Sequence, residues 1–195
     1  MSISSATIVP HYLRLRCWLL ACWLLLLSSA APVLAEDVRI LVDTDSRVLQ
    51  VLRGNRVVDS FEGIAIGRYG KSYFRSKGDN RTPLGKFRIG WITSNTRYHL
   101  FLGLTFPDLE AADRALQDGR IDEAQWQAIR RASVAGSTPP QNTPLGGNIG
   151  IHGVGEGSVA VHEQYNWTNG CVALTNDQID RLARWVKIGT PVESR

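Results

Sequence analysis

Short segments of alternating apolar and polar residues, each bounded by turn residues, occupy much of the chain after residue 36. Side chains that alternate with a period of two lie on opposite faces of an extended strand, so this pattern predicts β-strands. Strands are expected at residues 38–42, 48–52, 57–66, 86–92, 97–106 and 149–153, and an edge strand is expected at 190–192. The sequence therefore predicts a mostly β domain.

Two segments depart from this pattern and predict helices. Residues 108–133 are rich in Ala, Leu, Glu, Gln and Arg, so a helical insertion between strands is expected there. After the cysteine of the mature chain, residues 176–178 are expected to start a second helix that continues through 179–186, with Asn176 as its cap. The Gly- and Pro-rich segments 67–85 and 137–148 are expected to be loops, and a loop as long as the first is often functional.

Residues 1–35 have the features of a secretory signal. Two arginines precede an apolar run at 17–27, and small residues then lead to Val-Leu-Ala at 33–35. This order of charged, apolar and cleavage regions is typical of a signal peptide, so we expect one domain at 36–195. The expected location of that domain is the periplasm or the cell-wall space.

Two other interpretations of the N-terminal segment stay open. Residues 17–35 are long enough to cross a bilayer as an uncleaved anchor. The stretch Leu19-Leu20-Ala21-Cys22 resembles a lipoprotein cleavage box, although a cut there would leave leucines at the new terminus. Contact with a membrane is therefore expected only through an uncleaved signal, if at all.

Loss of the signal changes both the charge and the cysteine content. The net charge of +4 falls to +2 when the two signal arginines leave, which predicts no nucleic-acid partner. Cys17 and Cys22 leave as well, so Cys171 has no partner for an internal disulfide in an oxidising compartment. An unpaired exported cysteine is buried, joined to another chain, or chemically reactive.

The residues around Cys171 favour a nucleophilic role. At an ordinary pKa near 8.5 only about 3% of a thiol is thiolate at pH 7, so a reactive cysteine needs a base or a nearby positive charge. His152 lies 19 residues earlier in an apolar strand, and Gly170 leaves space for a substrate carbonyl and for backbone N–H groups that face an oxyanion. We therefore expect a Cys171–His152 pair with Gly170 and Cys171 as oxyanion donors, and a lowered pKa for the thiol.

Less specific interpretations exist for each of these residues. A lone cysteine between Gly and Val is often a small buried hydrophobe, and a lone histidine in an apolar strand is often part of the core. His162 is expected to be an exposed loop residue, although it could line the cleft. No pair among the histidines and the cysteine has the close spacing of zinc ligands, so neither a metal nor a cofactor is expected. An anion site or a solvated surface is expected from the basic residues Arg68, Lys71, Arg75, Lys77 and Arg81.

Three motifs in order resemble one known family. They are GDNRTPLGKFRI at 78–89, IHG at 151–153 and TNGCVALTN at 168–176. Together they resemble the L,D-transpeptidase catalytic domain family, also called YkuD-like, over about residues 38–192. The resemblance implies a β-sandwich-like fold with a cysteine nucleophile in a cleft under a mobile loop.

The resemblance also implies roles for individual residues. Cys171 matches the acylated cysteine, His152 the base, and Gly170 the glycine before the nucleophile. The implied reaction attacks an amide between an L-centre and a D-centre in a peptidoglycan stem peptide, and passes the acyl group to an amine of a second stem or of a wall-linked lipoprotein. The candidate substrate-binding residues are Gly153, Thr168, Asn169, Arg81, Tyr98 and His162.

Two positions depart from the common family pattern. Asn169 stands where the pattern has histidine, and Ala173 stands where it has arginine. We interpret this change as altered specificity. A peptidoglycan hydrolase that uses the same pair, with water as acceptor, and a wall-binding module without catalysis are the alternatives.

Overall fold

The structure is a computed structural model that describes residues 37–94 and 96–195, so the expected signal lies outside the described residues. Eight strands form one sheet in the order β3-β2-β1-β10-β6-β7-β8-β9. This confirms the prediction of a mostly β fold. The strands are β1 (Val38–Asp43), β2 (Val48–Arg53), β3 (Arg56–Glu62), β6 (Gly85–Thr93), β7 (Phe101–Leu104), β8 (Gly150–Gly153), β9 (Val172–Leu174) and β10 (Pro191–Ser194).

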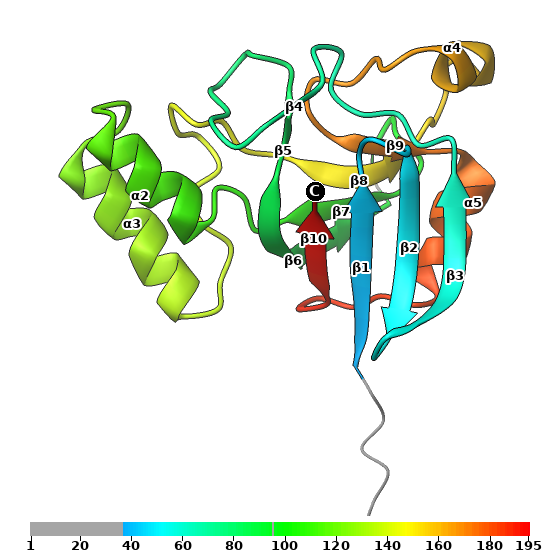
Figure 1. Ribbon diagram of the computed structural model, residues 1–195, viewed down its shortest axis with the longest axis horizontal. Helices are drawn as coiled ribbons and strands as arrows, with labels where there is room; N and C mark the ends of the chain where they lie inside the picture. Colours follow the sequence, from blue (N-terminus) through cyan, green and yellow to red (C-terminus); the bar gives the residue numbers. More distant parts are fainter. Residues whose placement is uncertain (1–36, 95) are drawn as a thin grey trace, which may run out of the picture. The chain divides into compact units, whose positions relative to one another are not determined.

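The sheet folds back on itself at β6, which pairs with β10 on one side and with β7 on the other. An irregularity in register between Ile89 and Trp91 interrupts the β6–β7 ladder, and such bulges bend a strand and increase its twist. Figure 1 shows the consequence: β1, β2 and β3 stand upright, whereas β7, β8 and β9 run across them. The two halves of the sheet therefore face each other across the core.

The two outer strands of the sheet are linked through the chain segment after β3. Gly63 has a φ of +72°, a conformation that favours glycine, and the chain then turns toward β9. The Ala65 N–H donates to the Ala173 carbonyl at 3.0 Å, and the Ala173 N–H donates to the Ala65 carbonyl at 2.7 Å. These bonds cover the edge of β9, so the sheet approaches a closed barrel.

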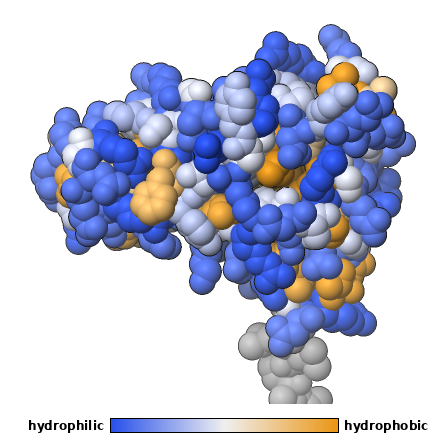
Figure 2. Space-filling view, turned by 45° about the horizontal axis from the view of Figure 1, so that its top comes forward, coloured by the Kyte–Doolittle hydropathy of each residue, from blue (hydrophilic) through white to orange (hydrophobic). Residues whose placement is uncertain are grey.

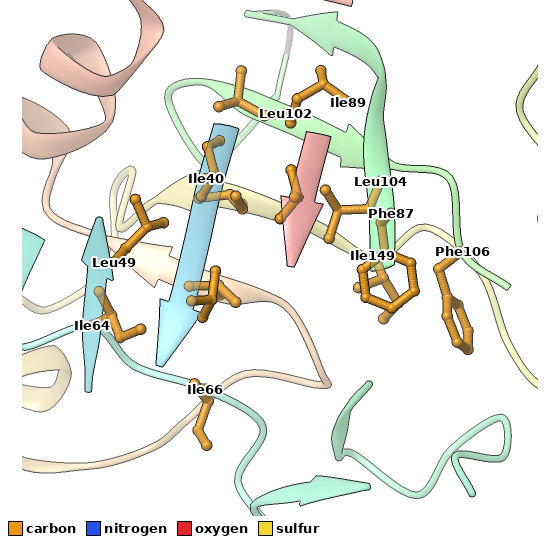
Figure 3. Close-up of a cluster of buried hydrophobic side chains, with 14 of the residues drawn as sticks. Ile40, Leu49, Ile64, Ile66, Phe87, Ile89, Leu102, Leu104, Phe106 and Ile149 are labelled. Carbon is orange, nitrogen blue, oxygen red and sulfur yellow. The ribbon is translucent and has the colours of Figure 1, made fainter. Parts of the chain in front are cut away.

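The core lies between the two halves of the sheet. Ile40 of β1, Leu49 of β2 and Phe87 of β6 are buried there with Leu102 of β7 and Ile149 before β8, and Figure 3 shows them pointing into one cluster. The face shown in Figure 2 is mainly hydrophilic, with hydrophobic residues in small separate groups. Burial of the alternating apolar residues thus sets the register of each strand, because a slip of one residue would expose them.

The helical insertion is confirmed as two helices, α2 (Leu109–Gln117) and α3 (Glu123–Val134). Asp108 caps α2, and Asp122 forms a capping box with Gln125 at the start of α3. The two helices pack on each other beside the β6 side of the sheet (Figure 1). No helix of the described residues is long and apolar enough to cross a membrane.

Several expected boundaries were wrong. The last strand is not an edge strand, because β10 lies between β1 and β6; Pro191 opens it, the position in a strand where a missing N–H is tolerated. The strand expected at 97–106 is regular only in β7. A helix not expected from the sequence, α4 (Val159–Gln164), follows β8, and the loop at 67–85 holds the two-residue strands β4 (Lys71–Ser72) and β5 (Thr82–Pro83).

The helix after the cysteine, α5 (Asn176–Ala183), ends before the expected residue 186, and its cap is Thr175 rather than Asn176. The Gln178 N–H donates to Thr175 Oγ1 at 3.3 Å, and the Thr175 N–H donates to Gln178 Oε1 at 3.0 Å. The Asn176 side chain instead bonds the backbone of Gly155, where its Oδ1 accepts from the N–H and its Nδ2 donates to the carbonyl. Asn176 therefore holds the loop after β8 against α5.

We predict that Thr175→Ala lowers the free energy of unfolding by about 1 kcal/mol, since an N-cap hydroxyl satisfies a helix N–H that otherwise lacks a partner. Thr175→Ser keeps the acceptor oxygen and is the matched control, expected to stay close to the wild type. Urea unfolding followed by circular dichroism measures both variants. An unchanged stability of the alanine variant would show that the cap contributes nothing.

Candidate active site

Cys171 and His152 line one cleft of about 760 Å³. The parallel pairing of β8 with β9 brings them together, because Ile151 is opposite Val172 and His152 is opposite Ala173. Cys171 therefore ends the loop that leads into β9, next to the strand that carries the histidine. The chain between them, residues 153–170, forms the crossover connection that parallel strands require.

His152 is 2% exposed and is held as a neutral ring. Its Nδ1 lies 2.7 Å from the Gly153 carbonyl, which can only accept, so Nδ1 carries the proton and Nε2 is free to take another. Tyr98 stacks on the ring at 4.2 Å between centroids, and the Trp167 ring meets it edge-on at 5.8 Å. Burial lowers the pKa of His152 to about 4, so the imidazole is a neutral base at pH 7.

The expectation of a lowered pKa for the Cys171 thiol was wrong. Part of the residue reaches solvent, but the protein around the sulfur raises its pKa to about 11. The Gly150 N–H and the positive charge of Arg75 oppose this effect without reversing it. The thiol donates to the Asn148 carbonyl at 3.7 Å, so the pair is neutral before substrate binds.

The loop before Cys171 is shaped by Thr168 and Gly170. The Thr168 hydroxyl donates to the Cys171 carbonyl at 2.7 Å and accepts the Gly170 N–H at 3.1 Å. The Gly170 N–H is thus engaged by Thr168 instead of facing the cleft as an oxyanion donor. Gly170 has a φ of +123°, and a Cβ there would lie 2.7 Å from the Arg81 carbonyl, so glycine is needed for the fold of the loop.

Some of the other expected substrate-binding residues line the cleft, and others lie outside it. Tyr98, Thr168 and Asn169 line the cleft, and Asn169 Oδ1 accepts a hydrogen bond from Arg68 at 2.7 Å. Gly153 packs tightly, because a Cβ there would lie 2.7 Å from Asn176 Oδ1. Arg81 is exposed and is not among the residues that line the cleft.

The expectation that His162 is an exposed loop residue was wrong. It lies in α4 with 1% of its surface exposed, because the helix turns it inward. Its Nδ1 accepts a hydrogen bond from Trp167 Nε1 at 3.3 Å. Since Trp167 also packs against His152, His162 is linked to the His152 ring through Trp167.

Of the basic residues in the 67–81 segment, some line the cleft and others make contacts outside it. Arg68 and Arg75 line the cleft. Lys71 instead pairs with Asp45, and Lys77 donates to Asn142. Arg97, Asn148 and Trp167 also line the cleft and were not predicted as site residues, although Trp167 opens the Trp-Thr-x-Gly-Cys motif, because each lies in or beside irregular structure whose path the sequence pattern does not define. Among the residues that the structure describes, no three His, Cys, Asp or Glu side chains gather as a metal site.

Fold and site together define a mostly β domain with a cysteine and a neutral histidine in one cleft. The model of the L,D-transpeptidase catalytic domain family, YkuD, matches residues 37–193, and the chain belongs to this family. The comparison with curated protein sequences finds no match.

Two solved structures share the fold. The helical cell shape determining protein Pgp2 from Campylobacter jejuni is 22% identical with a TM-score of 0.55, and covers 83% of this chain and 49% of its own. Bd1075 of Bdellovibrio bacteriovorus is 19% identical with a TM-score of 0.51, and covers 82% of this chain and 47% of its own. The chain thus spans about half the length of these structures.

We predict that alkylation of Cys171 by iodoacetamide rises with pH around a midpoint near 11, because burial disfavours the thiolate. A small free thiol, alkylated in parallel, is the control and reaches its midpoint near its ordinary value of about 8.5. Mass spectrometry of the protein at each pH gives the rate. A midpoint at or below that of the free thiol would contradict the buried environment described above.

Proposed function

We propose that the protein is a cysteine acyltransferase that acts on peptidoglycan stem peptides. The observation that carries the proposal is the neutral His152 ring and the Cys171 thiol in one cleft of an L,D-transpeptidase family domain. The family acts on peptidoglycan stem peptides. Nucleophile and base in one cleft are the minimum that thioester chemistry requires.

The reaction starts from the neutral pair. As the thiol sulfur attacks the carbonyl of the L-centre to D-centre amide, its proton passes to Nε2 of His152. The tetrahedral intermediate collapses when the imidazolium returns that proton to the leaving amine, which departs as a D-amino acid and leaves a thioester on Cys171. An incoming amine then gives a proton to Nε2 of His152 and attacks the thioester. The acyl group passes to the amine, and the Cys171 sulfur takes the proton back from the imidazolium.

The charge of the cleft supports a substrate that carries carboxylates. Arg68, Arg75 and Arg97 line it, against Glu156 as the opposing charge. Arg97 donates to the Tyr98 hydroxyl at 2.9 Å, and Tyr98 stacks on His152, so one guanidinium lies beside the base. The leaving group is a D-amino acid whose carboxylate is adjacent to its amine, and a cation near the base attracts that group.

The proposed acceptor is an amine of a second stem peptide or of a lysine in a wall-linked lipoprotein. Both occur outside the cytoplasm, which agrees with the proposed export of the chain by residues 1–35 to the periplasm or the cell-wall space. The Tyr98, Phe101 and Trp167 rings around His152 cover its apolar faces.

We predict that the purified protein forms a mass adduct at Cys171 with a stem tetrapeptide, and that Cys171→Ala abolishes turnover while the fold is kept. An added D-amino acid separates the two acceptors, because exchange products report transfer and shortened products alone report hydrolysis. Muropeptide mass spectrometry distinguishes these outcomes. Turnover by the alanine variant would disprove the proposed nucleophile, and binding to wall fragments without any adduct would identify a binding module.

The lowered pKa of His152 gives a second prediction. A base whose pKa is lowered stays unprotonated as the pH falls from 7 to 5, so kcat/KM should decline only near pH 4. The measurement uses a stem peptide with amidated carboxyls, so that ionisation of the substrate does not enter the profile. A decline centred near the ordinary histidine value of about 6.5 would contradict burial of the ring.

A further inference from the structure

Arg75 is the one arginine or lysine buried in residues 37–94 and 96–195, with 6% of its surface exposed. It lies between β4 and β5, in the segment that the sequence allowed to be a solvated loop. Burial of a guanidinium is costly unless its donors are satisfied. Its position therefore calls for a compensating set of contacts.

Those contacts come from three separate segments of the chain. Nε of Arg75 donates to the Arg81 carbonyl at 2.9 Å, Nη1 to the Leu145 carbonyl at 2.8 Å, and Nη2 to the Asn169 carbonyl at 3.2 Å. The guanidinium also lies 5.4 Å from the centre of the Phe106 ring. One planar group thus joins the 67–85 loop, the loop before β8 and the loop before Cys171.

Two glycines make room for this group. A Cβ on Gly146 would lie 2.1 Å from Arg75 Nη1, and a Cβ on Gly170 would lie 3.1 Å from Nη2. Both glycines are close to the nucleophile in the chain or in space. Gly170 precedes Cys171, and Gly146 is two residues before Asn148, whose carbonyl accepts the thiol at 3.7 Å.

We propose that Arg75 is a positioning residue that holds the Cys171 loop and the Asn148 loop in one arrangement and supplies the positive charge that the thiolate meets during acyl transfer. The proposal rests on Cys171 as the nucleophile. It does not follow from the fold alone, because backbone carbonyls could be joined by a neutral donor, whereas a charge acts on the thiolate as it forms.

Arg75 and Cys171 share the cleft with the charged side chains of Arg68, Arg97 and Glu156. Asp79 lies 3.7 Å from Arg75 Nε, and Arg120 donates to the Arg75 carbonyl at 3.2 Å. Burial lowers the pKa of Arg75 itself, with Asp79 and Cys171 opposing this change. His152 is the neutral base of the same cleft. Arg75 is thus the cation whose positive charge acts on the Cys171 sulfur.

Two substitutions of Arg75 separate its charge from its geometry. Arg75→Gln removes the charge, and Arg75→Lys keeps a charge but cannot reach three carbonyls. We expect the glutamine variant to alkylate with a midpoint at higher pH than the wild type. We expect both variants to lose acylation by a stem tetrapeptide, by roughly 10²-fold, because the nucleophile is misplaced.

The matched control is Arg181→Gln in α5. Arg181 also contacts a backbone carbonyl, an aspartate and an aromatic ring, namely Ser60, Asp59 and Phe61, but it does not line the cleft. The Arg181→Gln variant should have the same alkylation profile of Cys171 and the same acylation rate as the wild type. Gly146→Ala, which displaces the guanidinium without removing it, should reproduce the loss of acylation.

The outcomes are distinguishable. Folded Arg75→Gln with the wild-type alkylation midpoint and acylation rate would overturn the proposal while leaving Cys171 as nucleophile. If the glutamine variant does not fold, the lysine variant decides, and an unchanged acylation rate there would overturn the positioning role. A wild type that forms no adduct at all would reject the proposed function itself.

Discussion

The parallel pairing of β8 with β9 is the contact on which the site depends. It places the strand that carries His152 beside Cys171, which directly precedes β9, although Cys171 follows His152 by 19 positions in the chain. β9 is only three residues long and gains a second neighbour from the Ala65–Ala173 bonds. The bend at β6 and the turn at Gly63 matter for the site because they bring Ala65 close enough to Ala173 for these hydrogen bonds to form.

Burial of the pair explains its chemical state. The same low dielectric environment lowers the pKa of His152 and raises that of Cys171, since it disfavours charge on both groups. A neutral thiol is poorly reactive toward oxidants, which suits an unpaired cysteine. In the proposed reaction the thiolate forms only as the sulfur attacks the substrate carbonyl, and the positive cleft favours that step.

Ala173 and Asn169, which the resemblance set apart from the common motif, each have defined contacts in the structure. Ala173 is fully buried opposite Ala65, where two small side chains let the segment after β3 approach β9. Asn169 accepts Arg68 through its side chain and Arg75 through its carbonyl. Two of the three arginines that line the cleft, Arg68 and Arg75, therefore come from the 67–81 segment, and both donate to Asn169 in the loop before Cys171.

The sequence alone predicted the mostly β fold, the helical insertion and the pairing of Cys171 with His152 as candidates, because period-two patterns, helix-forming composition and reactive residue types are local properties. It did not predict the burial of His162 and Arg75 or the central place of β10. Nor did it predict the direction of the thiol pKa shift. Each of these depends on which distant segments pack together: Trp167 on His162, three carbonyls on one guanidinium, and β1 and β6 on either side of β10. Only the tertiary structure decides them, since local sequence does not encode the dielectric surroundings of a side chain or the partners that satisfy it.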